Sequence, residues 1–210
     1  MCWSATADLV AGAGVSAVGV ACVARVRDPR ALPLAALPLL LGVHQIVESV
    51  VWRSDGGGGP STVVWAVIAL PLLAVWMPVG VWCAAPPPAR PRLLLPLAVG
   101  AATAAVLAYA LATGPVTAEI RGRTIGYAVD APFPAVLVAG YLLATVGSLL
   151  LSGDRRLETL GFLAGAGALG CWALWRTEFV STWCAVAAVC SVVLFGWARA
   201  RQDGARGALT

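Results

Sequence analysis

The sequence has few charged residues and no lysine. Charged side chains make up 11% of the 210 residues, 60% are hydrophobic, and the mean hydropathy is +0.87. Soluble globular domains carry about 25% charged residues, so this composition nearly excludes that class. A helical span needs about 20 apolar residues, which leaves room for roughly seven spans and little else. We therefore expect an all-α, polytopic membrane bundle embedded in a lipid bilayer.

Several metal and cofactor sites are excluded by what is missing. The single histidine rules out a multi-histidine metal site and a bis-histidine haem site within one chain. The sequence has no Asp-rich cluster for magnesium, no Gly-rich phosphate loop and no Gly-x-Ser-x-Gly elbow. Its six cysteines form no CxxC pair, which is typical of small buried side chains. We expect no metal and no cofactor, which leaves proton chemistry or proton-coupled transport.

Seven apolar runs separated by Arg, Asp, Gly and Pro predict seven transmembrane helices. They fall at about 5–24, 31–52, 62–84, 93–114, 133–152, 159–175 and 179–198. The amino terminus lacks the basic region of a cleavable signal peptide, so the first run is interpreted as a retained helix. We expect residues 1–198 to form one seven-helix domain and residues 199–210 a cytoplasmic tail.

The arginines predict the orientation of these helices. Ten of the fourteen follow odd-numbered helices, and four lie on the opposite side, at Arg53, Arg121, Arg123 and Arg176. Positive residues are retained on the cytoplasmic side. We therefore expect a bacterial cell-membrane protein with its amino terminus outside and its carboxyl terminus inside. The net charge of +4 indicates topology, and no nucleic-acid partner is expected.

The connection from Thr117 to Phe133 is the longest one on the external side. It contains two β-prone stretches around an Arg-Gly-Arg turn. This pattern predicts a short external hairpin between the fourth and fifth helices, lying over the mouth of the bundle. The alternative is a solvated loop without a role.

Glu48 is the clearest ionisable residue inside a predicted span. His44, Glu48 and Trp52 are spaced four residues apart and share one helical face, with Gln45 beside them. Ionisable groups within a span usually face the bundle interior and carry function. The alternative is an interhelical hydrogen-bond cluster, a common use of such side chains. We favour function because an apolar surrounding keeps a carboxyl protonated and able to donate a proton.

Other acids and aromatic residues are predicted at the same external depth as Glu48. The turn between the last two helices contributes Trp172, Trp175, Glu178 and Trp183, the amino terminus contributes Trp3 and Asp8, and the hairpin contributes Tyr127 and Asp130. The alternative is an Arg176–Glu178 ion pair and an ordinary aromatic belt. Trp82 and Trp197, at cytoplasmic helix ends, are better belt candidates. Trp76, beside Pro78, is expected to face the interior.

Four segments resemble a family of small bacterial seven-helix membrane proteins. They are Met-Cys-Trp-Ser-Ala-Thr-Ala at the start, the run from Leu32 to Glu48, Thr-Gly-Pro-Val-Thr-Ala-Glu-Ile, and Ser-Thr-Trp-Cys. The resemblance spans the chain and extends to the membrane-bound terpene cyclases of actinobacterial drimentine-type secondary metabolism. It implies protonation-initiated cyclisation of a farnesyl or polyprenyl group on an indole-terpenoid or other meroterpenoid substrate. The enzyme would be a metal-independent isomerase that uses general acid-base catalysis.

The resemblance also implies roles for particular residues. It implies an acid in the second helix, which matches Glu48, and another in the last helix, which Glu178 matches loosely; Asp8 or Asp130 is an alternative. His44 would hydrogen-bond or reprotonate Glu48, and Gln45 with a water, or Glu178, would remove the final proton. Aromatic faces stabilise a cation by roughly 0.5–2 kcal/mol each, and the candidates are Trp3, Trp52, Trp172, Trp175, Trp183 and Tyr127.

Two other functions remain open from the sequence. A proton-coupled small-molecule transporter would use Glu48 as its proton carrier, although the sequence has no matched pair of interrupted helices. An accessory or structural membrane protein would use the polar stripe only for packing.

Overall fold

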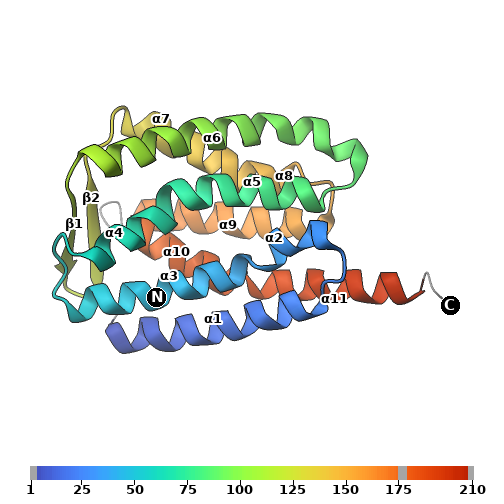
Figure 1. Ribbon diagram of the computed structural model, residues 1–210, viewed down its shortest axis with the longest axis horizontal. Coiled ribbons are helices and arrows are strands. Elements are labelled where there is room, and N and C mark those ends of the chain that lie inside the picture. The colour runs from blue at the N-terminus through green and yellow to red at the C-terminus, as the bar shows by residue number, and fades with distance from the viewer. Residues whose placement is uncertain (1–3, 175–178, 208–210) are drawn as a thin grey trace.

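The computed structural model describes residues 4–174 and 179–207 as a bundle of helices with one small hairpin (Figure 1). The longer helices run roughly along the long axis, and α10 and α11 follow each other in the same direction (Figure 1). The helices are α1 Ala5–Arg25, α2 Leu32–Ala35, α3 Leu37–Arg53, α4 Pro60–Val67, α5 Leu73–Ala84, α6 Arg90–Thr113, α7 Pro134–Leu142, α8 Ser148–Leu150, α9 Arg155–Leu174, α10 Phe179–Cys190 and α11 Val192–Gly207. The strands are β1 Val116–Arg121 and β2 Thr124–Val129.

Five helical stretches in the described part are long and apolar enough to cross a membrane. They are Ala5–Arg25, Pro29–Arg53, Pro60–Ala84, Pro87–Thr113 and Arg155–Leu174. Pro134–Leu150 is apolar but shorter. The last predicted span is divided at Ser191 into α10 and α11, and α11 continues to Gly207, so most of the predicted tail is helical. The protein is thus a largely helical bundle in which five described helices are long and apolar enough to cross a membrane.

Small residues bring α1 and α3 into close contact. A Cβ atom at Gly19 would lie 2.5 Å from the Leu39 nitrogen, and one at Gly42 would lie 2.2 Å from the Ser16 hydroxyl. Association between helices in lipid depends on such close backbone approach. The α1–α3 contact therefore holds the helix carrying Glu48 firmly against the first helix.

Two segments leave the regular α-helical pattern near the middle of the bundle. The π-helical turns η2 Ile68–Leu72 and η4 Leu143–Gly147 interrupt the third and fifth predicted spans. The Tyr141 hydroxyl donates a hydrogen bond of 2.5 Å to the Ala69 carbonyl inside η2. Such turns are frequent at functional sites, and Tyr141 ties these two parts of the bundle together.

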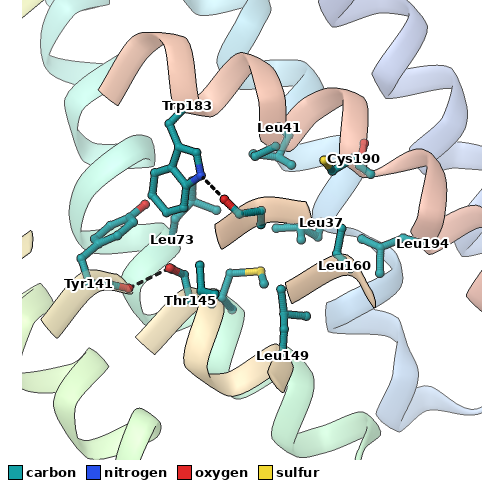
Figure 2. A pocket seen from close by; sticks show the side chains of 15 residues that line it. Leu37, Leu41, Leu73, Tyr141, Thr145, Leu149, Leu160, Trp183, Cys190 and Leu194 are labelled. Carbon is teal, nitrogen blue, oxygen red and sulfur yellow. Dashed lines mark hydrogen bonds between the residues drawn. The ribbon is translucent and has the colours of Figure 1, made fainter. Parts of the chain in front are cut away.

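A small apolar cavity lies at the centre of the bundle (Figure 2). Its volume is about 60 Å³, and residues from α3, α5, α9, α10 and the α7–α8 region line it. Leu41 on α3, Leu73 on α5 and Trp183 on α10 belong to its wall. The Trp183 indole N–H donates to the Ala164 carbonyl at 3.0 Å. The wall is therefore apolar, with the indole N–H already paired.

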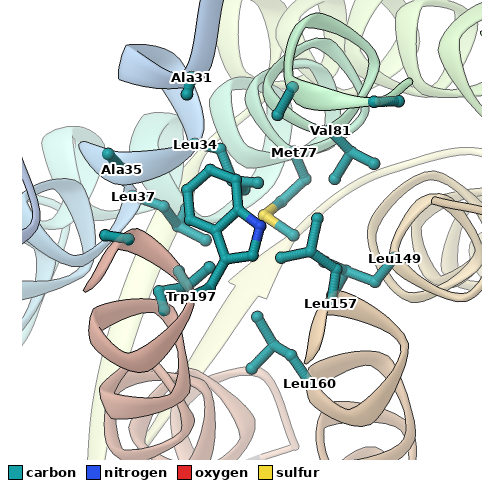
Figure 3. Close-up of a cluster of buried hydrophobic side chains, with 14 of the residues drawn as sticks. Ala31, Leu34, Ala35, Leu37, Met77, Val81, Leu149, Leu157, Leu160 and Trp197 are labelled. Atoms are coloured by element: carbon teal, nitrogen blue, oxygen red, sulfur yellow. The ribbon is translucent and has the colours of Figure 1, made fainter. Parts of the chain in front are cut away.

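The main hydrophobic core fills the half of the bundle toward the α11 end (Figure 3). Trp197 is 1% exposed and packs among leucines that include Leu34, Leu157 and Leu160. Its indole N–H donates to Asp154 Oδ2 at 3.0 Å. The prediction that Trp197 belongs to an aromatic belt is therefore wrong, because its ring is buried and its polar edge has a partner inside the protein.

The hairpin lies between α6 and α7, where the sequence indicated one. Val116 pairs with Val129 and Arg121 with Thr124 across the two strands, and the turn contains Gly122 at φ 64°. Ala118 also bridges to Gly57 in the α3–α4 connection. Together with Trp65 and Val51, the inward-facing strand residues form a second core cluster at this end of the bundle, including Val116, Ala118 and Ile125. The hairpin is thus packed against α3 and α4, and the solvated-loop alternative is wrong.

Candidate functional site

Glu48 lies on the inner face of α3 and is fully buried. Pro38 is the second residue of this helix and lies in its first turn, where the missing N–H of proline costs no intrahelical hydrogen bond. The Tyr127 hydroxyl, from β2, donates to Glu48 Oε1 at 3.4 Å. The contact joins residues that are 79 positions apart. The hairpin therefore contributes directly to the surroundings of the buried carboxyl.

Trp65 organises the space beside this carboxyl. Its ring stacks on Tyr127, with centroids 3.4 Å apart and an angle of 3° between the ring planes. The ring of His44, on α3, has its centroid 4.9 Å from that of Trp65. Trp65 and His44 are both 0% exposed. His44, Trp65 and Tyr127 thus form an array of three rings, and the hydroxyl of Tyr127 connects this array to Glu48.

Asp8 and Trp52 form a second polar contact one turn further along α3. The Trp52 indole N–H donates to Asp8 Oδ2 at 2.8 Å, and the carboxyl of Asp8 is 0% exposed. A buried charge needs a partner or becomes neutral. The pair fixes the outer end of the α1–α3 contact close to Glu48.

Several buried polar atoms of this cluster have no hydrogen-bond partner among the described residues. They are both ring nitrogens of His44, both side-chain amide atoms of Gln45, the indole nitrogen of Trp65 and Oδ1 of Asp8. An unsatisfied buried polar group costs about 1–3 kcal/mol. The cluster consequently has hydrogen-bonding capacity for a bound polar group, in addition to the buried acid.

The polar cluster and the central cavity lie along the same helix. Leu41 lines the cavity, and His44 and Glu48 follow it at spacings of three and seven residues on one face of α3. Seven residues of helix span about 10 Å. Glu48 therefore lies about 10 Å along α3 from a residue of the cavity wall, and His44 lies between the two positions on the helix.

The structure does not gather every residue that the sequence selected. Asp130 is exposed, and Trp172 is 52% exposed on the outer surface. Trp183, on α10, lines the central cavity. Trp3, Trp175 and Glu178 lie outside the described residues. Glu48, His44, Gln45, Trp52, Tyr127 and Asp8 lie at one end of the bundle, in the parts of α1, α3 and β2 that pack together there.

Sequence reasoning missed Trp65 and Tyr141. Trp65 follows Pro60 by five residues in the third apolar run, at the same predicted depth as Glu48, and this was the available signal. Tyr141 lies inside an apolar run, and no pattern in the sequence links it to Ala69 or Trp183. Its ring meets that of Trp183 edge-on, with centroids 5.7 Å apart and planes 69° apart.

The comparisons with known proteins can be set beside this geometry. Among the described residues, no three His, Cys, Asp or Glu side chains gather as a metal site. No curated protein and no solved structure matches the chain. The model of a family of unknown function, DUF6629, matches residues 1–208, and the chain belongs to that family.

Proposed function

We propose that this protein is a membrane-bound terpene cyclase that starts the cyclisation of a prenyl chain by protonating an alkene with Glu48. The observation that carries the proposal is the fully buried Glu48 carboxyl, which accepts a hydrogen bond from the hydroxyl of Tyr127, a ring that in turn stacks on Trp65. Protonating an isolated alkene needs a strong acid without competing water. The substrate is a farnesyl or similar polyprenyl group on an indole or other meroterpenoid.

The proposed reaction conserves the formula of the substrate. The O–H bond of Glu48 breaks while the π electrons of the terminal alkene form a C–H bond, which leaves a tertiary cation. The π electrons of the next alkene then close a ring and move the cation along the chain. Finally a neighbouring C–H bond breaks, and its proton passes to a base. Gln45 holding a water is the described group suited to that last transfer, because its amide has no other partner among the described residues.

Aromatic rings supply what the travelling cation needs. Tyr127 contacts the acid through its hydroxyl and stacks on Trp65, and Tyr141 and Trp183 line the central cavity. An aromatic face that is open to the substrate contributes about 0.5–2 kcal/mol of cation stabilisation and offers no nucleophile that would trap the cation, and Tyr141 and Trp183 are the described rings that line a cavity. This distribution supports a chain that extends from the cavity toward Glu48.

Asp8 is the described residue best suited to act with Glu48. The resemblance to terpene cyclases implies a second acid, and the sequence left Glu178, Asp8 and Asp130 as alternatives. Asp130 is exposed, whereas Asp8 is fully buried on α1. Asp8 accepts a hydrogen bond from Trp52, which lies one turn from Glu48 on α3. Asp8 would hold Trp52 and tune the acid through it.

The proposal includes seven spans with the amino terminus outside. In this proposal the five long apolar helices are five of the spans. Pro134–Leu150 is the sixth, and the α10–α11 pair is the seventh. Arginines gather at the end where α1 finishes and α6 and α9 begin, and the hairpin lies at the other end. The positive-inside rule then places Glu48 and the hairpin near the outside of the bacterial cell membrane.

Transport is the competing function, and the packing counts against it. The core around Leu34, Leu157 and Trp197 fills the half of the bundle opposite the polar cluster. A solute path across the membrane would have to cross this apolar packing. Proton-flux measurements in vesicles test this alternative directly.

The experiment uses purified full-length protein in nanodiscs with a farnesylated indole. We expect the wild-type protein to give a cyclic isomer of unchanged mass, detected by chromatography and by loss of alkene proton signals in NMR. Glu48→Gln keeps the size and removes the proton, so conversion should fall by about 10²-fold or more. Asp130→Asn is the matched control, because Asp130 is exposed, and it should convert normally. Full conversion by folded Glu48→Gln contradicts the proposed role of Glu48.

A further inference from the structure

A wide apolar groove opens on the outer surface between α9 and the segment from α7 to α8. Its volume is about 820 Å³. Leu142, Val146 and Leu150 line one wall, and Ala166 and Leu169 line the other. Leu169 is 71% exposed. Since these helices are apolar along their outer faces, the groove opens toward hydrocarbon in a membrane-embedded bundle.

Glycines form the floor of this groove. A Cβ atom at Gly161 would lie 2.9 Å from Leu150 Cδ2, and one at Gly165 would lie 3.3 Å from Val146 Cγ1. Gly147, in the π-helical turn η4, belongs to the same lining. The glycines therefore let α9 come close to the α7–α8 segment, and Leu150 and Val146 pack directly against them.

A row of aromatic rings connects the groove with the central cavity. Phe179 lines the groove and stacks on Trp183, with centroids 5.7 Å apart and planes 14° apart. Trp183 and Tyr141 both line the central cavity (Figure 2). A further cavity of about 70 Å³ borders Phe179, Trp183 and Tyr141 together. The groove, this small cavity and the central cavity therefore share walls in that order.

The volumes decide where a ligand chain fits. Pockets that hold drug-sized ligands measure roughly 300–1,000 Å³. The groove, at about 820 Å³, lies in this range, whereas the two inner cavities, at about 70 and 60 Å³, do not. A drug-sized ligand chain can therefore occupy the groove in this conformation. Phe179, Trp183 and Tyr141 must move before such a chain can reach the central cavity.

Tyr141 is the residue that holds this row in place. Its hydroxyl donates to the Ala69 carbonyl at 2.5 Å, and its ring meets Trp183 edge-on. Ala69 lies in the π-helical turn η2, where the helical hydrogen-bond pattern is already irregular. Release of this hydrogen bond would free the Tyr141 ring, whereas Trp183 is held separately by the hydrogen bond from its indole N–H to the Ala164 carbonyl.

We propose that the groove is the entry site for a linear prenyl chain from the bilayer, and that Phe179, Trp183 and Tyr141 gate its passage to the central cavity. The choice of a prenyl chain rests on the proposed function and on the lining. Phe162, Trp172 and Phe179 offer flat faces to the trigonal carbons of a prenyl chain, and close contact with such faces adds dispersion attraction along the chain.

The test uses a farnesol analogue with a diazirine at the chain end, added to full-length protein in nanodiscs and photolysed. Crosslinked peptides are mapped by mass spectrometry. We expect adducts in 142–150 and 161–172 that excess farnesol removes. Ala166→Trp fills the groove and should reduce this labelling about tenfold. Ala173→Trp is the matched control, because Ala173 is exposed on the same helix outside the groove lining, and it should label normally.

A saturated probe of equal length separates a prenyl site from a general lipid contact. Equal labelling of the groove by the saturated probe, or full labelling of folded Ala166→Trp, overturns the proposal. Leu169→Trp, also in the groove wall, serves in place of Ala166→Trp if that variant does not fold. Glu48→Gln should label as the wild type does. Groove labelling without conversion by the wild type therefore contradicts the cyclase, whereas conversion without groove labelling contradicts the entry site.

Discussion

Replacement of Trp65 by leucine should detach the hairpin from the bundle. Trp65 is fully buried, stacks on Tyr127 at 3.4 Å, and belongs to the cluster that holds Val116 and Ile125 against α4. Trp65→Leu keeps an apolar side chain but removes the stacked ring. The hairpin then loses its stacking contact with α4, and Glu48 becomes more accessible to water.

The size of this effect follows from the contacts. An aromatic pair contributes about 0.5–1.5 kcal/mol beyond area burial, and truncating a large buried residue costs about 3–5 kcal/mol at most. Loss of the stack alone shifts hairpin opening by about tenfold, since 1.4 kcal/mol corresponds to a factor of ten. Trp65→Phe keeps a ring and should show a smaller change.

Limited trypsin digestion measures this opening directly. Arg121 and Arg123 flank the exposed turn of the hairpin, so cleavage there reports its detachment. We expect cleavage at these sites to be about tenfold faster in Trp65→Leu. Trp82→Leu, a half-buried tryptophan that contacts Arg90, is the matched control and should leave the rate unchanged. Equal cleavage in wild type and folded Trp65→Leu refutes the role given to the stack.

Three further predictions concern stability in detergent, measured by thermal unfolding. Gly19→Val should destabilise the protein by about 1–3 kcal/mol through overpacking, because a Cβ atom at Gly19 would lie 2.5 Å from the Leu39 nitrogen. Gly14→Val is the control and should not destabilise the protein, because nothing lies within 4 Å of a Cβ atom at Gly14. Equal melting temperatures of the two variants would contradict this packing. Asp8→Ala should cost about 1–3 kcal/mol by leaving the Trp52 N–H unpaired, and Asp8→Asn should restore most of it; no difference between them argues against the hydrogen bond. Tyr141→Phe should lower the free energy of unfolding by about 0.5–1.5 kcal/mol, because the hydrogen bond to the Ala69 carbonyl is lost. An unchanged melting temperature would contradict a stabilising role of this hydrogen bond.

Much of the site followed from the scarcity of charge. A carboxyl in a long apolar run stands out, and the four-residue spacing of His44, Glu48 and Trp52 correctly predicted a shared helical face. The Arg-Gly-Arg sequence likewise predicted the turn of the hairpin. These features depend on local chemistry and helical periodicity, which a sequence displays directly.

The remaining features depend on which distant segments meet. The burial of Trp65 required Tyr127 to fold back over α4, and the burial of Trp197 required Asp154 as a partner for its indole N–H. A tryptophan near a helix end looks the same in sequence whether it faces lipid or the core. The π-helical turns at 68–72 and 143–147 were also missed, because hydropathy averaged over a span does not register one extra residue per turn.

The most direct test of Glu48 as the proton donor is the position of deuterium in the product after turnover in D₂O. The Glu48 proton exchanges with solvent between turnovers. The wild-type product should therefore carry one deuterium on the former alkene CH carbon of the last prenyl unit, which receives the initiating proton. Glu48→Gln should form this product more slowly, by about 10²-fold or more. Cyclic product without deuterium at that carbon, or deuterated product from Glu48→Gln at the wild-type rate, would contradict the account.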